Sequence, residues 1–378
     1  MRIAYVYLGA SIDRLAGVRK KLVDQGVAWR REGHEPQFFL QVGDRKVEAV
    51  PTAGWEDLRV HIFSTTPGAP RWTRAFTRMQ QVRRLVEAVQ RWGPSVVYLR
   101  YSVHYPALSG LLRNLPVVLE VNTNDLEEYA LQLDPIRFLY HRLTRGLLLK
   151  SVRGIVFVTG ELQRLPAFDR WGKASIVIGN GVALDRFARA PAPAGGRPRL
   201  VFVGEPALPW HGVDKIVELA HREPAWDFDI VGLQRGAVDH DLRISPNLSF
   251  HGYLTGEEYQ AVMRRADVGI GTLALHRKGM SEACSLKVRD YLAIGLPVII
   301  GHEDPDLDPD SWFVLRLSNT PDNVVTEAQR IRVFVDRVKG RRVAREEVAH
   351  LDTTVKERQR LEFIARIAGD GTAGRRPR

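Results

Sequence analysis

Residues 279–300, GMSEACSLKVRDYLAIGLPVII, hold the densest set of side chains that could do chemistry. Glu282 and Asp290 lie eight positions apart, and Lys287 stands between them. Residues 286–294 are predicted to form a helix because a glycine and then a proline follow them. A helix N-terminus with a nearby lysine favours a bound anion such as a phosphate. The alternative is a surface loop with ordinary charges. The other segments of the chain are needed to choose between these two interpretations.

Strands and helices alternate along the chain. Apolar, β-branched runs predict strands at 2–8, 37–42, 60–63, 96–100, 117–121, 155–159 and 176–179, then at 200–204, 228–232, 248–252, 267–271 and 298–301. Helical patterns include 18–31, 71–92, 213–221, 257–265, 286–294, 322–339 and 355–368. This alternation predicts an α/β protein with two doubly wound, Rossmann-like domains. Because ligands bind at the carboxyl ends of such strands, we expect the site in a cleft between the two domains.

The length of 378 residues favours two domains. Segment 190–198, APAPAGGRP, has no periodicity and is predicted to be the linker. We therefore predict an N-terminal domain at 1–190, on the acceptor side, and a C-terminal donor domain at 191–345. Residues 346–378 are predicted to form a helix that packs back on the N-terminal domain and a disordered tail.

Composition places the chain among globular proteins, with 44% hydrophobic and 26% charged residues. The first residues are typical of a strand and not of a signal peptide, and no run is long enough to span a membrane. These features predict a cytoplasmic protein. A single cysteine, Cys284, excludes a disulfide framework and a multi-cysteine metal site. We interpret Cys284 as a small buried residue.

The net charge of +11 comes from the first half of the chain. Residues 1–190 hold 28 Lys and Arg against 17 Asp and Glu, whereas the rest holds 27 of each kind. This asymmetry predicts an anionic partner for the first half. In the predicted helix 71–92, an apolar stripe is accompanied by six arginines; the stripe consists of Phe76, Met79, Val82, Val86 and Val89. The stripe is predicted to pack on the core, and the basic face could touch an anionic membrane surface, making the protein peripheral at the inner membrane face.

Four segments in order resemble the retaining glycosyltransferases of family four, which have the GT-B fold. They are IGNGVALDRF, FVGEPALPWHGVDKIVELA, FHGYLTGEEYQAVMRRADVGIGTL, and the stretch at 279–300 that runs into GLPVI. The resemblance covers about 176–301 well, and the first half matches mainly in its layout.

The resemblance implies roles for the residues of the opening stretch. The family has two glutamates eight positions apart, and Glu282 and Asp290 stand at those places. Glu282 is implied to contact hydroxyls of the donor sugar, and Asp290 to bond the ribose of the nucleotide. Because Asp is one methylene shorter than Glu, we expect the ribose contact to be altered or mediated by water. Ser285, Leu286 and Lys287 are implied to lie against the diphosphate, with Glu282 and Lys287 as the catalytic pair.

Two positions depart from the family pattern in the donor loop that begins at Gly204. Many members carry an arginine after this glycine and a lysine before the glycine of K-G-V-D, where this chain has Glu205 and His211. A carboxylate cannot bind phosphate. The phosphate contacts are therefore expected from Lys287, the loop backbone, and His211 or Arg289. The alternative for His211 is a helix-cap or turn residue.

In the first half, Asn122 lies at or near the place where the family often carries a histidine beside the reacting sugar. Asn122 cannot act as a base but can hydrogen-bond a sugar hydroxyl. Arg100, at the end of another strand, could contact the acceptor or pair with an acid. Gly17 would let the loop after the first strand approach the donor. Retaining transfer in this fold is assigned to a mechanism in which the departing phosphate helps deprotonate the acceptor, so neither a protein base nor a metal or other cofactor is expected.

The sequence thus predicts a hexosyltransferase-type enzyme that moves a sugar from a nucleotide-sugar donor to a glycan, lipid-linked or small-molecule acceptor, in cell-surface polysaccharide or glycoconjugate synthesis. A second hypothesis is a sugar-nucleotide epimerase of the same fold, which would convert the nucleotide sugar without any acceptor. A third is a basic α/β protein that binds nucleic acid or lipid without catalysis. The aromatic content of 8% and the lack of a nucleic-acid-binding motif argue against nucleic acid as the partner.

Overall fold

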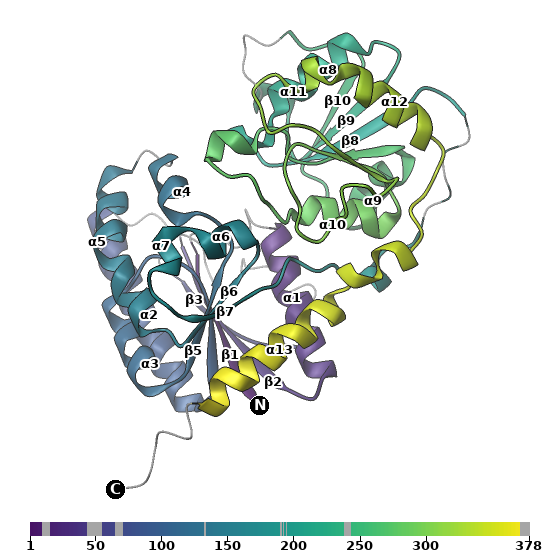
Figure 1. Ribbon diagram of the computed structural model, residues 1–378. Coiled ribbons are helices and arrows are strands. Elements are labelled where there is room, and N and C mark those ends of the chain that lie inside the picture. Colours follow the sequence, from purple (N-terminus) through teal and green to yellow (C-terminus); the bar gives the residue numbers. More distant parts are fainter. Residues whose placement is uncertain are drawn as a thin grey trace, which may run out of the picture. The chain divides into compact units, whose positions relative to one another are not determined.

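The computed structural model describes residues 1–9, 16–43, 55–64, 71–131, 134–189, 191, 193, 195–237 and 243–370. The chain divides into two compact units, residues 1–178 with 353–378, and residues 179–352 (Figure 1). Parts of the predicted linker and of the predicted tail, including 371–378, lie outside the described residues.

Within the described residues, the first unit is built on a parallel sheet of seven strands. In chain order these are β1 (Arg2–Leu8), β2 (Glu35–Val42), β3 (Arg59–Ser64), β4 (Val96–Arg100), β5 (Val117–Val121), β6 (Gly154–Phe157) and β7 (Ala174–Val177). They lie in the order β3-β2-β1-β4-β5-β6-β7. Runs such as RIAYVYL in β1 are apolar almost throughout because both faces of the strand are buried.

Helices cover both faces of this sheet. They are α1 (Ala16–Arg31), α2 (Arg71–Trp92), α3 (Ser109–Asn114), α4 (Asp125–Leu131), α5 (Pro135–Ser151), α6 (Gly160–Arg164), α7 (Pro166–Asp169) and α13 (Thr353–Asp370). Parallel strands are joined by right-handed crossovers, and the chain reverses its direction across the sheet after β3, so α2, α3 and α5 cover the face opposite α1. The helix α13 packs beside α1 (Figure 1).

The second unit holds a parallel sheet of six strands in the order β10-β9-β8-β11-β12-β13. The strands are β8 (Arg199–Val203), β9 (Asp227–Val231), β10 (Leu248–Gly252), β11 (Val268–Ile270), β12 (Val298–Ile300) and β13 (Val314–Arg316). The helices are α8 (Val213–Arg222), α9 (Gly256–Arg265), α10 (Leu286–Ile294), α11 (Asn323–Thr326) and α12 (Ala328–Val338). Two parallel, doubly wound sheets confirm the predicted α/β class. In such a sheet the strand order reverses between β8 and β11, and ligands bind beyond the carboxyl ends at that point.

Helix α2 corrects one part of the sequence interpretation. Val82, Val86 and Val89 are buried, as predicted for a stripe that packs on the core. Phe76 and Met79 are instead 63% and 48% exposed, so the predicted packing is wrong for the first turns. Among the described side chains of this helix, the buried ones begin at Val82. Across the described ranges, no helix is both long and apolar enough to cross a bilayer.

Candidate functional site

The first element of the site is the carboxyl end of β8, where Gly204 follows the strand. Its amide donates a 2.9 Å hydrogen bond to the Val231 carbonyl of the neighbouring strand. A Cβ at this position would lie 2.4 Å from the Phe202 ring and 3.0 Å from Nδ1 of His211. Glycine therefore allows the His211 ring to come close to the strand end.

His211 is buried and lies in the short 3-10 turn η4 (Pro209–His211) before α8. Its ring meets Phe202 edge-on with 5.7 Å between centroids. Burial lowers the pKa of His211 to about 2, and the charges of Lys287 and Lys278 act in the same direction. Nδ1 has no hydrogen-bond partner within the described part of the chain. The residue is thus both a turn residue and a neutral imidazole with an unused nitrogen.

Lys287 lies in the first turn of α10. Its Nζ is buried 4.1 Å from the centroid of the Phe202 ring and has no hydrogen-bond partner among the described residues. Burial lowers the pKa of Lys287 to about 7, and the attraction of Glu205 offsets this only in part. The pKa of Glu205 is raised by burial, against the opposing effect of Lys287. Buried polar groups almost always have partners, and an anionic ligand is one group that could partner this amine.

The start of α10 adds backbone donors to the same place. Ser285 precedes the helix with an extended backbone, and its side chain makes no capping hydrogen bond. The first N–H groups of an α-helix have no partner within the helix, and Leu286 carries the first of them. Together with the positive end of the helix dipole, these groups favour an anion beside Lys287.

Glu282 and Asp290 are both half-buried and are positioned by different contacts. The Glu282 segment pairs with residue Glu303 through the backbone: the Ala283 amide donates to the Glu303 carbonyl over 2.9 Å. The Asp290 carboxylate accepts a 3.0 Å hydrogen bond from the hydroxyl of Tyr259 on α9. Both acids are thus held by elements outside α10.

The expectation that Arg289 could contact the phosphate is corrected by the structure, because its guanidinium is already paired with carboxylates. Its guanidinium is fully buried and donates to both carboxylate oxygens of Asp304, over 2.7 and 2.8 Å, and to Asp306 over 2.9 Å. It also donates to the Asn180 carbonyl and to the Cys284 sulfur. These ion pairs and hydrogen bonds neutralise the charge of Arg289. They also connect three segments of the chain, at Asn180, at Cys284 and at residues 304–306.

Cys284 is buried, as predicted. Its sulfur and one carboxylate oxygen each of Asp304 and Asp306 lie within 4.8 Å of one another, which is a spacing that could suit a metal ion. The Arg289 guanidinium contacts all three and already supplies the positive charge. Burial raises the pKa of Cys284 to about 12, so the thiol is not a nucleophile at neutral pH.

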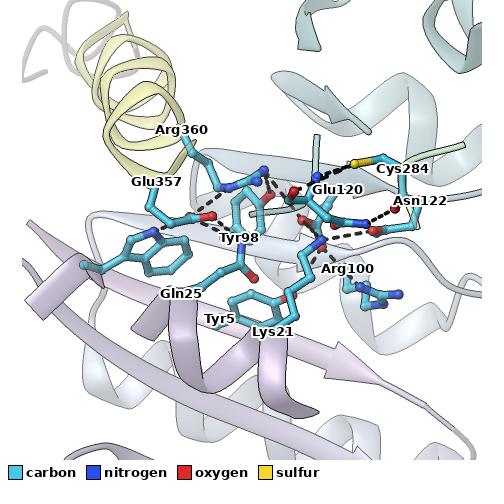
Figure 2. A network of polar contacts seen from close by, with 12 residues as sticks. Tyr5, Lys21, Gln25, Tyr98, Arg100, Glu120, Asn122, Cys284, Glu357 and Arg360 are labelled. Atoms are coloured by element: carbon cyan, nitrogen blue, oxygen red, sulfur yellow. Dashed lines mark hydrogen bonds and ion pairs between the residues drawn. The ribbon is translucent and has the colours of Figure 1, made fainter. Parts of the chain in front are cut away.

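In the first unit, Glu120 near the end of β5 is the centre of a buried ionic network (Figure 2). It accepts from Lys21 Nζ over 2.8 Å and from Arg100 Nη1 over 3.4 Å, and Arg360 of α13 lies 3.6 Å away. Burial by itself would raise its pKa, but the three cations hold the pKa of Glu120 well below its usual range. Glu120 is therefore a fixed anion and cannot act as a general base. Of the two alternatives for Arg100, the structure shows the ion pair with an acid.

Asn122 lies just beyond this network, at the carboxyl end of β5. Its Oδ1 accepts a 3.0 Å hydrogen bond from Lys21 Nζ, which directs the other half of the amide outward from that pair (Figure 2). Nδ2 has no partner in the described ranges and can donate to a sugar hydroxyl. Gly17 lies in the first turn of α1. The loop 10–15 before it is outside the described residues, so the predicted approach of that loop to the donor stays a prediction.

Within the second unit, the structure brings together three of the predicted residues, Gly204, His211 and Lys287. Sequence reasoning missed His302, which follows β12 and is buried with Nε2 unpartnered among the described residues. A histidine directly after a strand, at the carboxyl edge of a parallel sheet, is the signal that could have found it. It also missed Lys21 and Arg360, whose helical positions carry no such signal.

A scan against models of known protein families found no match, and a search of curated protein sequences found none either. Solved structures do match over nearly the whole chain. Sucrose-phosphate synthase from Thermosynechococcus elongatus is 14% identical with a TM-score of 0.65, over 98% of each chain. The catalytic domain of starch synthase IV from Arabidopsis thaliana, bound to ADP and acarbose, is 12% identical with a TM-score of 0.65, over 98% of this chain and 99% of that one.

A UDP-GlcNAc 2-epimerase from Neisseria meningitidis, bound to UDP-GlcNAc, is also similar. It is 12% identical with a TM-score of 0.56, over 97% of this chain and 100% of that one. At such low identity these likenesses establish the fold alone. With its parallel sheets of seven and six strands, the chain has the GT-B fold.

Proposed function

We propose that the protein is a retaining glycosyltransferase that takes its sugar from a nucleoside diphosphate sugar. The observation that carries this proposal concerns two buried nitrogens, Nζ of Lys287 and Nδ1 of His211, which have no hydrogen-bond partner among the residues that the structure describes. They lie against the Phe202 ring, beside the N-terminus of α10. A diphosphate supplies the acceptor oxygens that both nitrogens lack. ADP and UDP-GlcNAc are named with two of the similar structures, and both contain a diphosphate.

In the proposed reaction, charge develops on the leaving diphosphate as its bond to the sugar breaks. Lys287 and the first N–H groups of α10 stabilise that charge, and no metal is needed for this step. A phosphate next to Lys287 restores its ordinary preference for the ammonium form. Glu282 orients the sugar through its hydroxyls. Asp290, oriented by Tyr259, accepts from the ribose.

On the acceptor side, we propose Asn122 as a hydrogen-bond donor to a sugar hydroxyl. Arg100 is paired with Glu120 through Nη1, and its remaining guanidinium donors are proposed to contact the acceptor. Glu120 is a fixed anion, so the departing phosphate oxygen takes the acceptor proton. The proposed acceptor is a hydroxyl of a glycan, a lipid-linked saccharide or a small metabolite, used in cell-surface polysaccharide or glycoconjugate synthesis.

Nucleoside diphosphates are expected to raise the melting temperature of the intact protein, because a ligand that binds only the folded state stabilises it by mass action. The affinity should fall as the pH rises above about 7, because free Lys287 then loses the proton that the bound diphosphate requires. Isothermal titration calorimetry with ADP and UDP across this range measures the slope. Nucleosides without phosphate are the control. If a nucleoside and its diphosphate raise the melting temperature equally, the diphosphate does not contribute to binding and the proposed diphosphate site is wrong.

Glu282→Ala is expected to lower sugar transfer about 100-fold, because the donor sugar loses a polar contact that positions it for reaction. Initial rates with a panel of nucleotide sugars and simple glycoside acceptors measure the effect. Glu303→Ala is the matched control, since Glu303 pairs with the same segment through its backbone and its side chain is exposed. Unchanged turnover in Glu282→Ala would show that the sugar site has been misassigned.

A second candidate function is sugar-nucleotide epimerisation, which the likeness to the UDP-GlcNAc 2-epimerase favours. An epimerase uses the same diphosphate contacts but needs no acceptor. Incubating the protein with nucleotide sugars alone distinguishes the two. An epimeric nucleotide sugar in the absence of acceptor indicates the epimerase, and transfer that requires an acceptor indicates the glycosyltransferase.

A further inference from the structure

Helix α5 of the first unit has a face of large apolar side chains that nothing in the described part of the chain covers. The face follows helical spacing over about three turns. It consists of Ile136, Leu139, Tyr140, Leu143 and Leu147, which are 82%, 56%, 38%, 73% and 56% exposed. The opposite face of the same helix carries the buried residues His141, Arg145, Leu148 and Leu149. The side of the helix that faces the core thus mixes charged and apolar residues, whereas the exposed side is apolar.

The inner face of α5 is fixed by a buried ionic contact and not by apolar packing alone. Arg145 donates to both carboxylate oxygens of Asp125 over 2.8 and 2.9 Å, and His141 Nε2 lies 2.6 Å from the same carboxylate. These bonds fix the rotation of the helix about its axis. The apolar face therefore cannot turn inward, and its exposure is a built feature of the fold. Soluble monomers rarely leave such a contiguous apolar face open unless it binds something.

Basic side chains outnumber acidic ones on the helices around this face. Helices α2, α3 and α5 lie side by side on one face of the sheet (Figure 1). Among the described side chains of these helices, the exposed basic residues are Arg83, Arg84, Arg91, Arg113, Arg142 and Lys150, and the exposed acid is Glu87. The acidic pair Glu127 and Glu128 belongs to α4, and the exposed Asp134 is the N-cap of α5, so these three acids lie at the N-terminal end of the face. Phe76 and Met79 of α2 add exposed apolar side chains to the same helical layer.

We propose that this face, defined as the apolar residues of α5 with Arg142 and Lys150, docks on an anionic phospholipid surface. An amphipathic helix with an apolar stripe and basic flanks lies in the plane of the membrane interface, with the stripe among the acyl chains and the cations at the headgroups. The surplus of basic over acidic side chains matches an anionic bilayer. The proposed docking element is thus α5, whereas the sequence had indicated the helix at 71–92.

Cosedimentation of the full-length protein with vesicles tests this proposal. The vesicles contain phosphatidylcholine alone or phosphatidylcholine with phosphatidylglycerol, at low and at high NaCl. The protein should bind the anionic vesicles and lose affinity at high salt. Leu143→Gln/Leu147→Gln should bind at least about tenfold more weakly, because two side chains that enter the acyl region are lost. Arg142→Gln/Lys150→Gln should weaken binding to anionic vesicles and remove much of its salt dependence.

Val333→Gln is the matched control, because Val333 is 56% exposed on α12 of the second unit. It should bind vesicles as the unchanged protein does, and all variants should keep the same melting temperature because the altered side chains are exposed. Failure of the unchanged protein to bind anionic vesicles overturns the proposal, as does binding that survives Leu143→Gln/Leu147→Gln. A dimer in light scattering that this double variant dissociates, with no vesicle binding, would assign the face to self-association instead.

Discussion

Replacing Lys287 with methionine is expected to lower sugar transfer by a factor of about 100 to 1,000, because a preorganised charge is removed from the place where the leaving diphosphate becomes negative. Methionine is one atom shorter than lysine but keeps an unbranched apolar chain, so the main change is the loss of the Nζ amine and its charge over the Phe202 ring. The rate of donor hydrolysis and of transfer, measured at saturating acceptor, gives the size of the effect. Affinity for the nucleoside diphosphate should fall together with turnover.

The same substitution should make the free protein more stable, which distinguishes a ligand-binding lysine from a structural one. A buried ammonium without a hydrogen-bond partner is a cost to folding, and methionine removes it. The gain depends on pH in a defined direction. The lysine of the unfolded chain keeps its proton up to the ordinary lysine pKa of 10.5, whereas folded Lys287 loses it near 7. The cost is therefore complete below about pH 7 and fades as the pH rises toward the unfolded value.

Lys215 is the matched control. It is also a buried lysine of the second unit, but its amine has hydrogen-bond acceptors, whereas the amine of Lys287 has none among the described residues. The Nζ of Lys215 donates to the carbonyls of Leu273 and Thr320 and to the Asn323 side chain, over 2.9, 2.6 and 3.0 Å. Lys215→Met should lower the melting temperature, because three acceptors lose their donor. If Lys287→Met also lowers it, Lys287 has a structural partner and the proposed phosphate role loses its main support.

The sequence predicted the strands and helices well where hydrophobic periodicity was strong. Helices 71–92 and 286–294 have the predicted bounds, and most strands differ by a residue or two at their ends. These segments combine a long apolar pattern with glycine or proline at the ends, so local signals agree with the tertiary fold. The predicted helix 322–339 is divided into α11 and α12, with Glu327 between them. Periodicity could not show this break, because Glu327 also fits a helix.

The functional site was harder to predict, because it depends on which charged side chains are already paired. Lys287 and Arg289 lie two positions apart, and both were candidates for a phosphate. In the structure Arg289 is ion-paired with Asp304 and Asp306, whereas Lys287 Nζ has no partner among the described residues. The difference arises from segments that follow in the chain and from the rotation of α10, neither of which a local pattern contains. The exposed face of α5 escaped notice for the same reason, since apolar spacing alone does not say which side of a helix is covered.

Arg289→Met is expected to lower the free energy of unfolding of the second unit by about 3–5 kcal/mol, because it leaves the buried Asp304 and the partly buried Asp306 without their cation. Asp304 is completely buried at its side chain and receives two hydrogen bonds from the guanidinium. Amide hydrogen exchange of the buried strands β8 and β9, followed during urea unfolding of the full-length protein, reports on this unit. Arg222→Ala is the control, since its ion pair with Glu218 is exposed and should cost less than about 1 kcal/mol.

Turnover of Arg289→Met links this network to the donor loop. Arg289 contacts the Asn180 carbonyl, the Cys284 sulfur and Asp304, and Cys284 is two residues from Glu282. Loss of these bonds should let the Glu282 segment shift, so kcat should fall while the affinity for nucleoside diphosphate, which depends on Lys287 and the α10 N-terminus, changes little. A double variant with Asp304→Asn should regain part of the lost stability, because one of the two unpaired carboxylates is then neutral. If affinity falls as steeply as kcat at a temperature where the variant is folded, Arg289 acts on the diphosphate itself and the separation of the two roles is wrong.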